Sequence, residues 1–177
     1  MNYLTFTPME TIRNKVEESG LIQLDLADFK PKLELVAVDL SVALWQGLVL
    51  KEKEFRTWVK EHNWQNYQGK AVYVHCSADA IVPTWAFMLV ASVLVDSTEY
   101  FIIGSKDELE KQLIAQKIAK LPLEKYADER IIIKGCSDIG SPAFAMSELM
   151  KRLQPIVQSI MYGEPCSTVP IFKRKKG

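Results

Sequence analysis

Three cysteines, each followed directly by a serine, are the residues of this sequence best suited to chemistry: Cys76, Cys136 and Cys166. A thiolate is a nucleophile, a redox group and a ligand for soft metals. Three converging thiolates would hold Zn²⁺ with one open coordination position. They would also hold an iron–sulfur cluster with one iron left open. The pattern therefore predicts a Zn or iron–sulfur cofactor, although no two of the cysteines form a CxxC pair.

Nearby side chains offer a fourth ligand, and His75 and Asp79 are the candidates beside the first cysteine. His75 directly precedes Cys76, and neighbours on a regular strand point to opposite faces of the sheet. Asp79 and Asp138 each follow a Cys-Ser pair closely, where an aspartate also serves as a helix N-cap. The predicted metal ligands are therefore the three cysteines with Asp79 and His75.

Two other functions fit the same residues. Cys76 before a helix N-terminus suits a thiol-dependent redox enzyme. Cysteine is also among the most frequently buried residue types, which fits a non-enzymatic binding module with structural cysteines. The sequence holds no GxxxxGK[ST], GxGxxG, HExxH or GxSxG motif, so the common nucleotide-binding and hydrolase mechanisms are not indicated.

A repeated strand–loop–helix pattern positions the first two cysteines. Strands are predicted over Ala71–His75 and Arg130–Lys134, and each is followed by Cys-Ser, a short loop, a proline and a helix. The tail carries a shortened copy over Cys166–Pro170. Ligands of open parallel sheets bind outside the carboxyl ends of the strands, which is where Cys76 and Cys136 would lie.

The remaining pattern predicts an α/β fold, a three-layer sandwich around a mainly parallel sheet with an N-terminal strand and helix extension. We expect one domain over residues 1–177. Residues 1–69 would hold the N-terminal strands and helices, 70–162 the repeated βα units, and 163–177 a C-terminal tail.

The individual elements follow from periodicity and capping signals. Helices are expected over Met9–Glu18, Leu50–His62, Ser105–Lys120, where Ser105 and Glu108 fit a capping box, and Pro142–Gln154 or on to Tyr162. The apolar run Ile81–Val95 predicts a buried helix, too short to span a membrane. Further strands are expected over Leu21–Leu26, Leu33–Leu40 and Glu99–Gly104, and an extended tail after Cys166.

Charge and composition give no sign of a nucleic-acid or membrane partner. The chain has 22 basic and 22 acidic side chains and no net charge, so no bulk electrostatic attraction to polyanions is expected. The start of the sequence lacks a basic and apolar leader pattern. An odd number of cysteines argues against a secreted disulfide framework, so a cytoplasmic location is expected.

Five segments resemble an uncharacterised bacterial family, the domain of unknown function numbered twenty-four eighty: 20–22, 67–70, 76–86, 134–137 and 159–170. The resemblance covers nearly the whole chain and all three Cys-Ser positions. It implies no established activity. The genomic surroundings associated with the family imply iron–sulfur assembly proteins as partners, and a small molecule is the other expected partner.

Overall fold

The computed structural model describes residues 20–135 and 139–175. These residues form two compact units, each built around its own sheet. We call the first the three-stranded unit, whose described residues are 26–121 and 139–152, and the second the four-stranded unit, whose described residues are 20–25, 122–135 and 153–175. The α/β class with mainly parallel strands is confirmed. The distribution of the strands between two sheets was not indicated by the order of elements along the chain.

The three-stranded unit holds a parallel sheet in the order β2-β3-β4. The strands are β2 (Leu35–Asp39), β3 (Ala71–His75) and β4 (Tyr100–Ile103). The helices are α2 (Glu52–Glu61), α3 (Thr84–Leu94), α4 (Lys106–Ala119) and the part of α5 (Pro142–Leu153) that belongs to this unit. Short 3₁₀ turns, η1 to η3, cover Leu26–Phe29, Leu40–Ala43 and Trp64–Tyr67.

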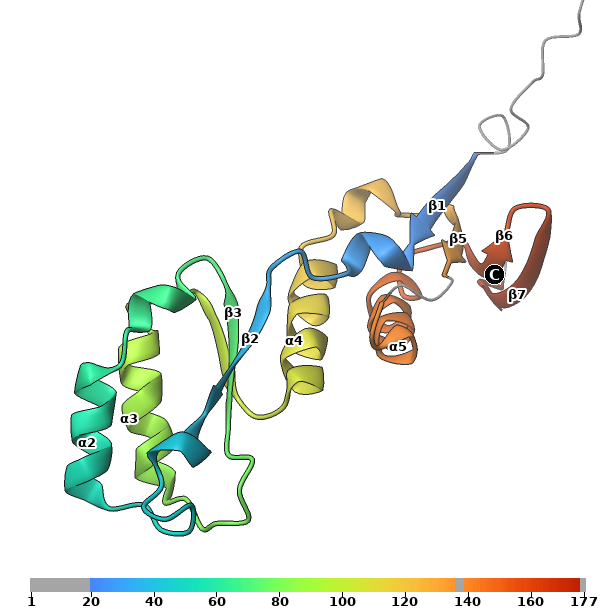
Figure 1. Ribbon diagram of the computed structural model, residues 1–177. Coiled ribbons are helices and arrows are strands. Elements are labelled where there is room, and N and C mark those ends of the chain that lie inside the picture. Colours follow the sequence, from blue (N-terminus) through green and yellow to red (C-terminus); the bar gives the residue numbers. More distant parts are fainter. Residues whose placement is uncertain (1–19, 136–138, 176–177) are drawn as a thin grey trace, which may run out of the picture. The chain divides into compact units, whose positions relative to one another are not determined.

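Helices cover both faces of this sheet, and Figure 1 shows α2 and α3 on one side and α4 on the other. Alternate residues of β3 account for the two cores. Val72 and Val74 face α2 and α3, whereas Ala71 and Tyr73 face α4. The chain steps in one direction from β2 through β3 to β4, so right-handed crossovers place α2 and α3 on the same face. This unit is therefore a three-layer sandwich.

Local signals explain where these helices begin and what they bury. The Ser105 hydroxyl accepts from the Glu108 backbone N–H and the Glu108 carboxylate accepts from the Ser105 N–H, so the predicted capping box is confirmed. Helix α2 buries Phe55 and Val59 as expected. Helix α3 buries one face, formed by Ala86, Val90 and Leu94, whereas Met88 is 65% exposed. The prediction of a buried helix is therefore confirmed for that face only, and Ile81, which was predicted to belong to the helix, lies in the preceding loop and is 92% exposed.

The four-stranded unit holds a sheet in the order β1-β5-β6-β7. Its strands are β1 (Leu21–Asp25), β5 (Arg130–Lys134), β6 (Ser159–Glu164) and β7 (Ser167–Lys173), with the 3₁₀ turn η4 at Leu123–Lys125. Strands β1, β5 and β6 are parallel, and β7 pairs antiparallel with β6. Pro170 is tolerated within β7 because this strand lies at the edge of the sheet and needs no partner on its outer side.

Two predictions for the C-terminal quarter were wrong. Helix α5 ends at Leu153, close to the predicted end at Gln154, but the alternative extension to Tyr162 is wrong because Ser159–Glu164 forms β6. The segment after Cys166, predicted as an extended tail outside the sheet's elements, is a strand of the sheet, because its backbone pairs with β6 from Ser167 to Lys173. The helix expected over Met9–Glu18 lies outside the described residues. No helix in the described ranges is both long and apolar enough to cross a lipid bilayer.

Candidate functional site

Cys76 lies directly after β3, at the carboxyl end of the three-stranded sheet. Its side chain is half-buried against the core formed with α2 and α3. The thiol donates a weak hydrogen bond to the Ala78 carbonyl oxygen, with an Sγ–O distance of 3.7 Å. The strand-end position is as predicted.

His75 and Asp79 do not join Cys76 at one point. The His75 ring stacks on Tyr73, with 5.4 Å between ring centroids, and Tyr73 packs on the α4 side of the sheet. Cys76 packs on the α2 and α3 side, so the prediction that His75 and Cys76 face opposite ways is confirmed. Asp79 is exposed in the loop before α3.

Cys166 lies in the turn between β6 and β7 of the four-stranded unit, and its side chain is exposed. Cys136 and Asp138 lie outside the described residues. Within residues 20–135 and 139–175, no cluster of three His, Cys, Asp or Glu side chains could hold a metal ion. The shared three-cysteine site for Zn or an iron–sulfur cluster therefore stays a prediction.

A carboxylate network that the sequence analysis missed joins the loops after β2 and β3. Asp39 accepts hydrogen bonds from the Ser41 backbone N–H at 2.9 Å, the Ser77 N–H at 3.0 Å and the Ser77 hydroxyl at 2.5 Å. The hydroxyls of Ser77 and Ser41 are 3.1 Å apart. Burial acts to raise the pKa of Asp39, but these hydrogen bonds outweigh it and hold the pKa well below its ordinary value. Asp39 and Ser77 are 38 residues apart, so no local motif could have revealed the pair.

The network gives the serine of the first Cys-Ser pair a structural role. Ser77 connects its loop to β2 through hydrogen bonds to Asp39. This structural role accounts for a serine at this position without a catalytic role. It supports the simpler view that βα loops carry serine for local hydrogen bonding. The cysteine of the pair is not explained by this network.

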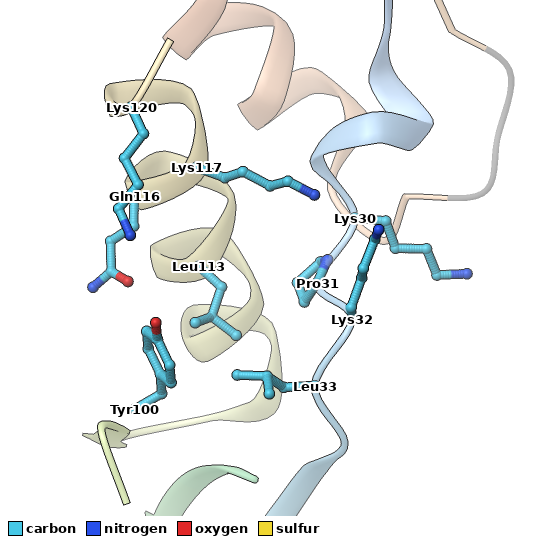
Figure 2. A pocket seen from close by; sticks show the side chains of 9 residues that line it. All are labelled: Lys30, Pro31, Lys32, Leu33, Tyr100, Leu113, Gln116, Lys117 and Lys120. Atoms are coloured by element: carbon cyan, nitrogen blue, oxygen red, sulfur yellow. The ribbon is translucent and has the colours of Figure 1, made fainter. Parts of the chain in front are cut away.

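A cavity of about 210 Å³ lies at the opposite, amino-terminal edge of the same sheet. Figure 2 shows its lining: one wall is the segment before β2, the other is the last part of α4, and Tyr100 stands at the start of β4. Helix α4 runs back across the sheet after β4, which brings its C-terminal residues to this edge. Pro31, Leu33, Leu113 and the Tyr100 ring supply apolar surface.

Four lysines dominate the polar lining of this cavity: Lys30, Lys32, Lys117 and Lys120. No Asp or Glu is among the nine lining residues, and Gln116 completes the set. In Figure 2 the Lys117 side chain extends toward the wall that carries Pro31 and Lys32. Lys32, Lys117 and Lys120 form no ion pair with any residue of the described ranges. The cavity therefore combines an apolar surface with concentrated positive charge.

Comparison with known proteins identifies a family and no characterised relative. No curated protein and no solved structure matches the chain. A family model described as "Protein of unknown function (DUF2480)" matches residues 10–174 of the 177. That range contains both sheets and all three cysteines. The resemblance noted from the sequence is thereby confirmed, and the chain belongs to the DUF2480 family.

Proposed function

We propose that this protein binds a small anionic molecule in the lysine-lined cavity of its three-stranded unit. The observation that carries the proposal is the absence of any carboxylate among lining residues that include four lysines. The whole chain is electrically neutral, with 22 basic and 22 acidic side chains, so this local excess is not a consequence of composition. Lys32, Lys117 and Lys120 form no ion pair within the described ranges, so their like charges repel one another and a bound anion would neutralise them.

The helix dipole alone does not account for the lysines. Lys117 and Lys120 lie near the C-terminus of α4, where a positive charge is favourable. Lys30 and Lys32 belong to a different segment, more than eighty residues earlier in the chain, so the sequence of α4 does not account for their presence at this cavity. Two separate elements therefore bring positive charge to one cavity.

The apolar lining makes the cavity suitable for a ligand and not only for a counterion. Long lysine stems pack over apolar surface while the ammonium groups stay in contact with water. Leu33, Leu113 and the Tyr100 ring provide such surface here. Ligand sites are typically apolar hollows with a few well-placed polar groups that fix orientation.

Isothermal titration calorimetry with inorganic phosphate and with pyrophosphate tests the proposal. The double variant Lys32→Gln, Lys117→Gln should weaken pyrophosphate binding at least about tenfold, since each charge-assisted hydrogen bond contributes on the order of 1.5 kcal/mol. Lys53→Gln is the matched control, because Lys53 is an exposed lysine on α2 and lies outside the cavity. Equal affinity in the wild type and the double variant would refute the proposal, and so would no binding at all.

A second proposal concerns the three cysteines, which we propose bind Zn²⁺ or an iron–sulfur cluster. Its support is the threefold Cys-Ser pattern together with two described cysteines that are free thiols. Metal analysis and absorption spectra of anaerobically purified protein test it, with Cys76→Ala, Cys136→Ala and Cys166→Ala beside the wild type. Metal that is lost in all three variants would support one shared site. Metal-free protein after anaerobic reconstitution would refute it.

A further inference from the structure

A second cavity adjoins the lysine-lined cavity at the same edge of the three-stranded unit. It has a volume of about 540 Å³, and the two cavities share Leu33 and Tyr100 as lining residues. The remaining wall comes from the turn before β3 and from the segment between α3 and β4. The two cavities therefore adjoin at Leu33 and Tyr100, and a ligand that occupied both would lie across these two side chains.

The two cavities have different charge. The second is lined by one lysine, Lys70, and by two exposed carboxylates, Asp96 and Glu99. Lys70 is engaged with Glu34 at an N–O distance of 3.3 Å. Within the described residues, the charged groups that form no ion pair are therefore carboxylates in the second cavity, whereas in the first they are lysines.

The buried polar groups of the second cavity are already satisfied within the protein. The Thr98 hydroxyl donates to the Lys70 carbonyl oxygen at 2.5 Å, and the Ser97 hydroxyl donates to the Val93 carbonyl oxygen at 3.0 Å. Both side chains are buried. Recognition in this cavity is therefore left to exposed side chains, the Gln68 amide and the carboxylates of Asp96 and Glu99, and the carboxylates require donors or a positive charge on the ligand.

Size also separates the roles of the two cavities. A volume of about 210 Å³ is below the roughly 300–1,000 Å³ typical of sites that enclose a whole small molecule. The first cavity suits a compact head group, and a phosphate monoester carries about −1.5 to −2 charge at neutral pH. The second cavity lies within the typical range and suits the body of the ligand.

We infer that the ligand is a phosphate monoester whose head lies among Lys32, Lys117 and Lys120 and whose body, bearing hydroxyl or amino groups, lies beside Asp96 and Glu99. This inference rests on the proposed anion-binding function and specifies its ligand class. Opposite charges at the two ends would orient the ligand and would discriminate against a body that is itself anionic.

A series of four probes measured by calorimetry tests the inference: inorganic phosphate, glucosamine 6-phosphate, glucose 6-phosphate and 6-phosphogluconate. The three sugar phosphates have similar size and differ in the charge of the body. Glucosamine 6-phosphate should bind most tightly and 6-phosphogluconate most weakly, with a span of about tenfold from one favourable and one unfavourable charge contact near the surface. Inorganic phosphate, which lacks a body, should bind more weakly than glucose 6-phosphate.

The double variant Asp96→Asn, Glu99→Gln should reduce this span to about twofold and leave the affinity for inorganic phosphate unchanged. Asp79→Asn is the matched control, since Asp79 is an exposed aspartate at the opposite edge of the sheet. Equal affinities of the wild type for the three sugar phosphates would overturn the inference. The anion-binding proposal would then still stand if the Lys32→Gln, Lys117→Gln variant lost phosphate binding, and it would fall if that variant bound every probe like the wild type.

Discussion

Removing the Asp39 carboxylate should destabilise the three-stranded unit by about 2 kcal/mol. Asp39→Ala removes three hydrogen bonds, two from Ser77 and one from the Ser41 backbone. A hydrogen bond to a charged group contributes about 1.5–3 kcal/mol when it is shielded from water. Asp39 is only half-buried and Ser77 is exposed, so about 0.5–1 kcal/mol for each bond is the appropriate value. The sum is about 2 kcal/mol.

Tryptophan fluorescence during urea unfolding measures this loss. All four tryptophans, Trp45, Trp58, Trp64 and Trp85, lie in the three-stranded unit, so their signal reports on that unit. A loss of about 2 kcal/mol should lower the urea midpoint by about 1–2 M, since the free energy of unfolding falls by about 1–2 kcal/mol per molar urea for a small unit. Asp79→Ala, which removes an exposed aspartate in the neighbouring loop, should change stability by less than about 0.5 kcal/mol.

A double-mutant cycle tests the stated cause. Ser77→Ala removes one of the three bonds to Asp39, so its cost should be smaller in the Asp39→Ala background than in the wild type by about 0.5–1 kcal/mol. Additive costs would show that the two side chains do not stabilise the loops through each other. A loss below about 0.5 kcal/mol for Asp39→Ala alone would refute the reasoning entirely.

The pH dependence supplies an independent check with a defined sign. The folded pKa of Asp39 lies well below the ordinary value of 3.8, so the folded state releases this proton more readily than the unfolded chain. The stabilisation is therefore fully present above about pH 5 and is lost progressively as the pH falls through 3.8 toward the folded pKa. Asp39→Asn should lack this component, and its stability should fall less steeply than that of the wild type between pH 5 and about pH 3.

Three further predictions concern other parts of the chain. Burial lowers the pKa of His62 below 6.5, so stability should fall as the pH drops below about 6.5, and His62→Gln should lose that component in urea titrations at several pH values. Gly163→Ala should lower the free energy of unfolding by about 1 kcal/mol or more beyond the loss for Gly69→Ala, measured by thermal unfolding. Both glycines have positive φ, so the backbone strain is common to the two variants, but only at Gly163 would the added Cβ lie 2.6 Å from the Ser167 carbonyl oxygen. Cys166 is exposed and Cys76 is half-buried, so the Cys166 thiol should react faster with Ellman's reagent, and Cys166→Ser should remove the faster phase of the reaction. If Cys76→Ser removed the faster phase instead, that result would favour thiol chemistry at Cys76.

The sequence by itself determined the class of fold and the position of most elements. Strand β3 was predicted at Ala71–His75 and β5 at Arg130–Lys134, because short β-branched runs bounded by turn residues are readable without knowledge of their partners. The capping box at Ser105 was likewise readable, since its two hydrogen bonds join residues only three apart. The opposite orientation of His75 and Cys76 followed from the two-residue repeat of a strand.

Tertiary structure alone decided which strands share a sheet and which side chains meet. Strands β1 and β5 pair although more than one hundred residues separate them along the chain, and the local sequence of β1 does not indicate which strand is its partner. The segment after Cys166 was predicted as a tail because it contains Pro170, which is unfavourable inside a sheet, and because its strand is stabilised by pairing with β6, which the sequence does not show.

The candidate sites show the same division. The cysteines were visible from the sequence because a repeated residue pair is a local pattern. The lysine cavity was not, because Lys32 and Lys117 belong to a loop and a helix that come together only when α4 packs across the sheet. Asp39 and Ser77 meet because parallel neighbouring strands end at the same edge, which is a property of the folded sheet and not of either segment.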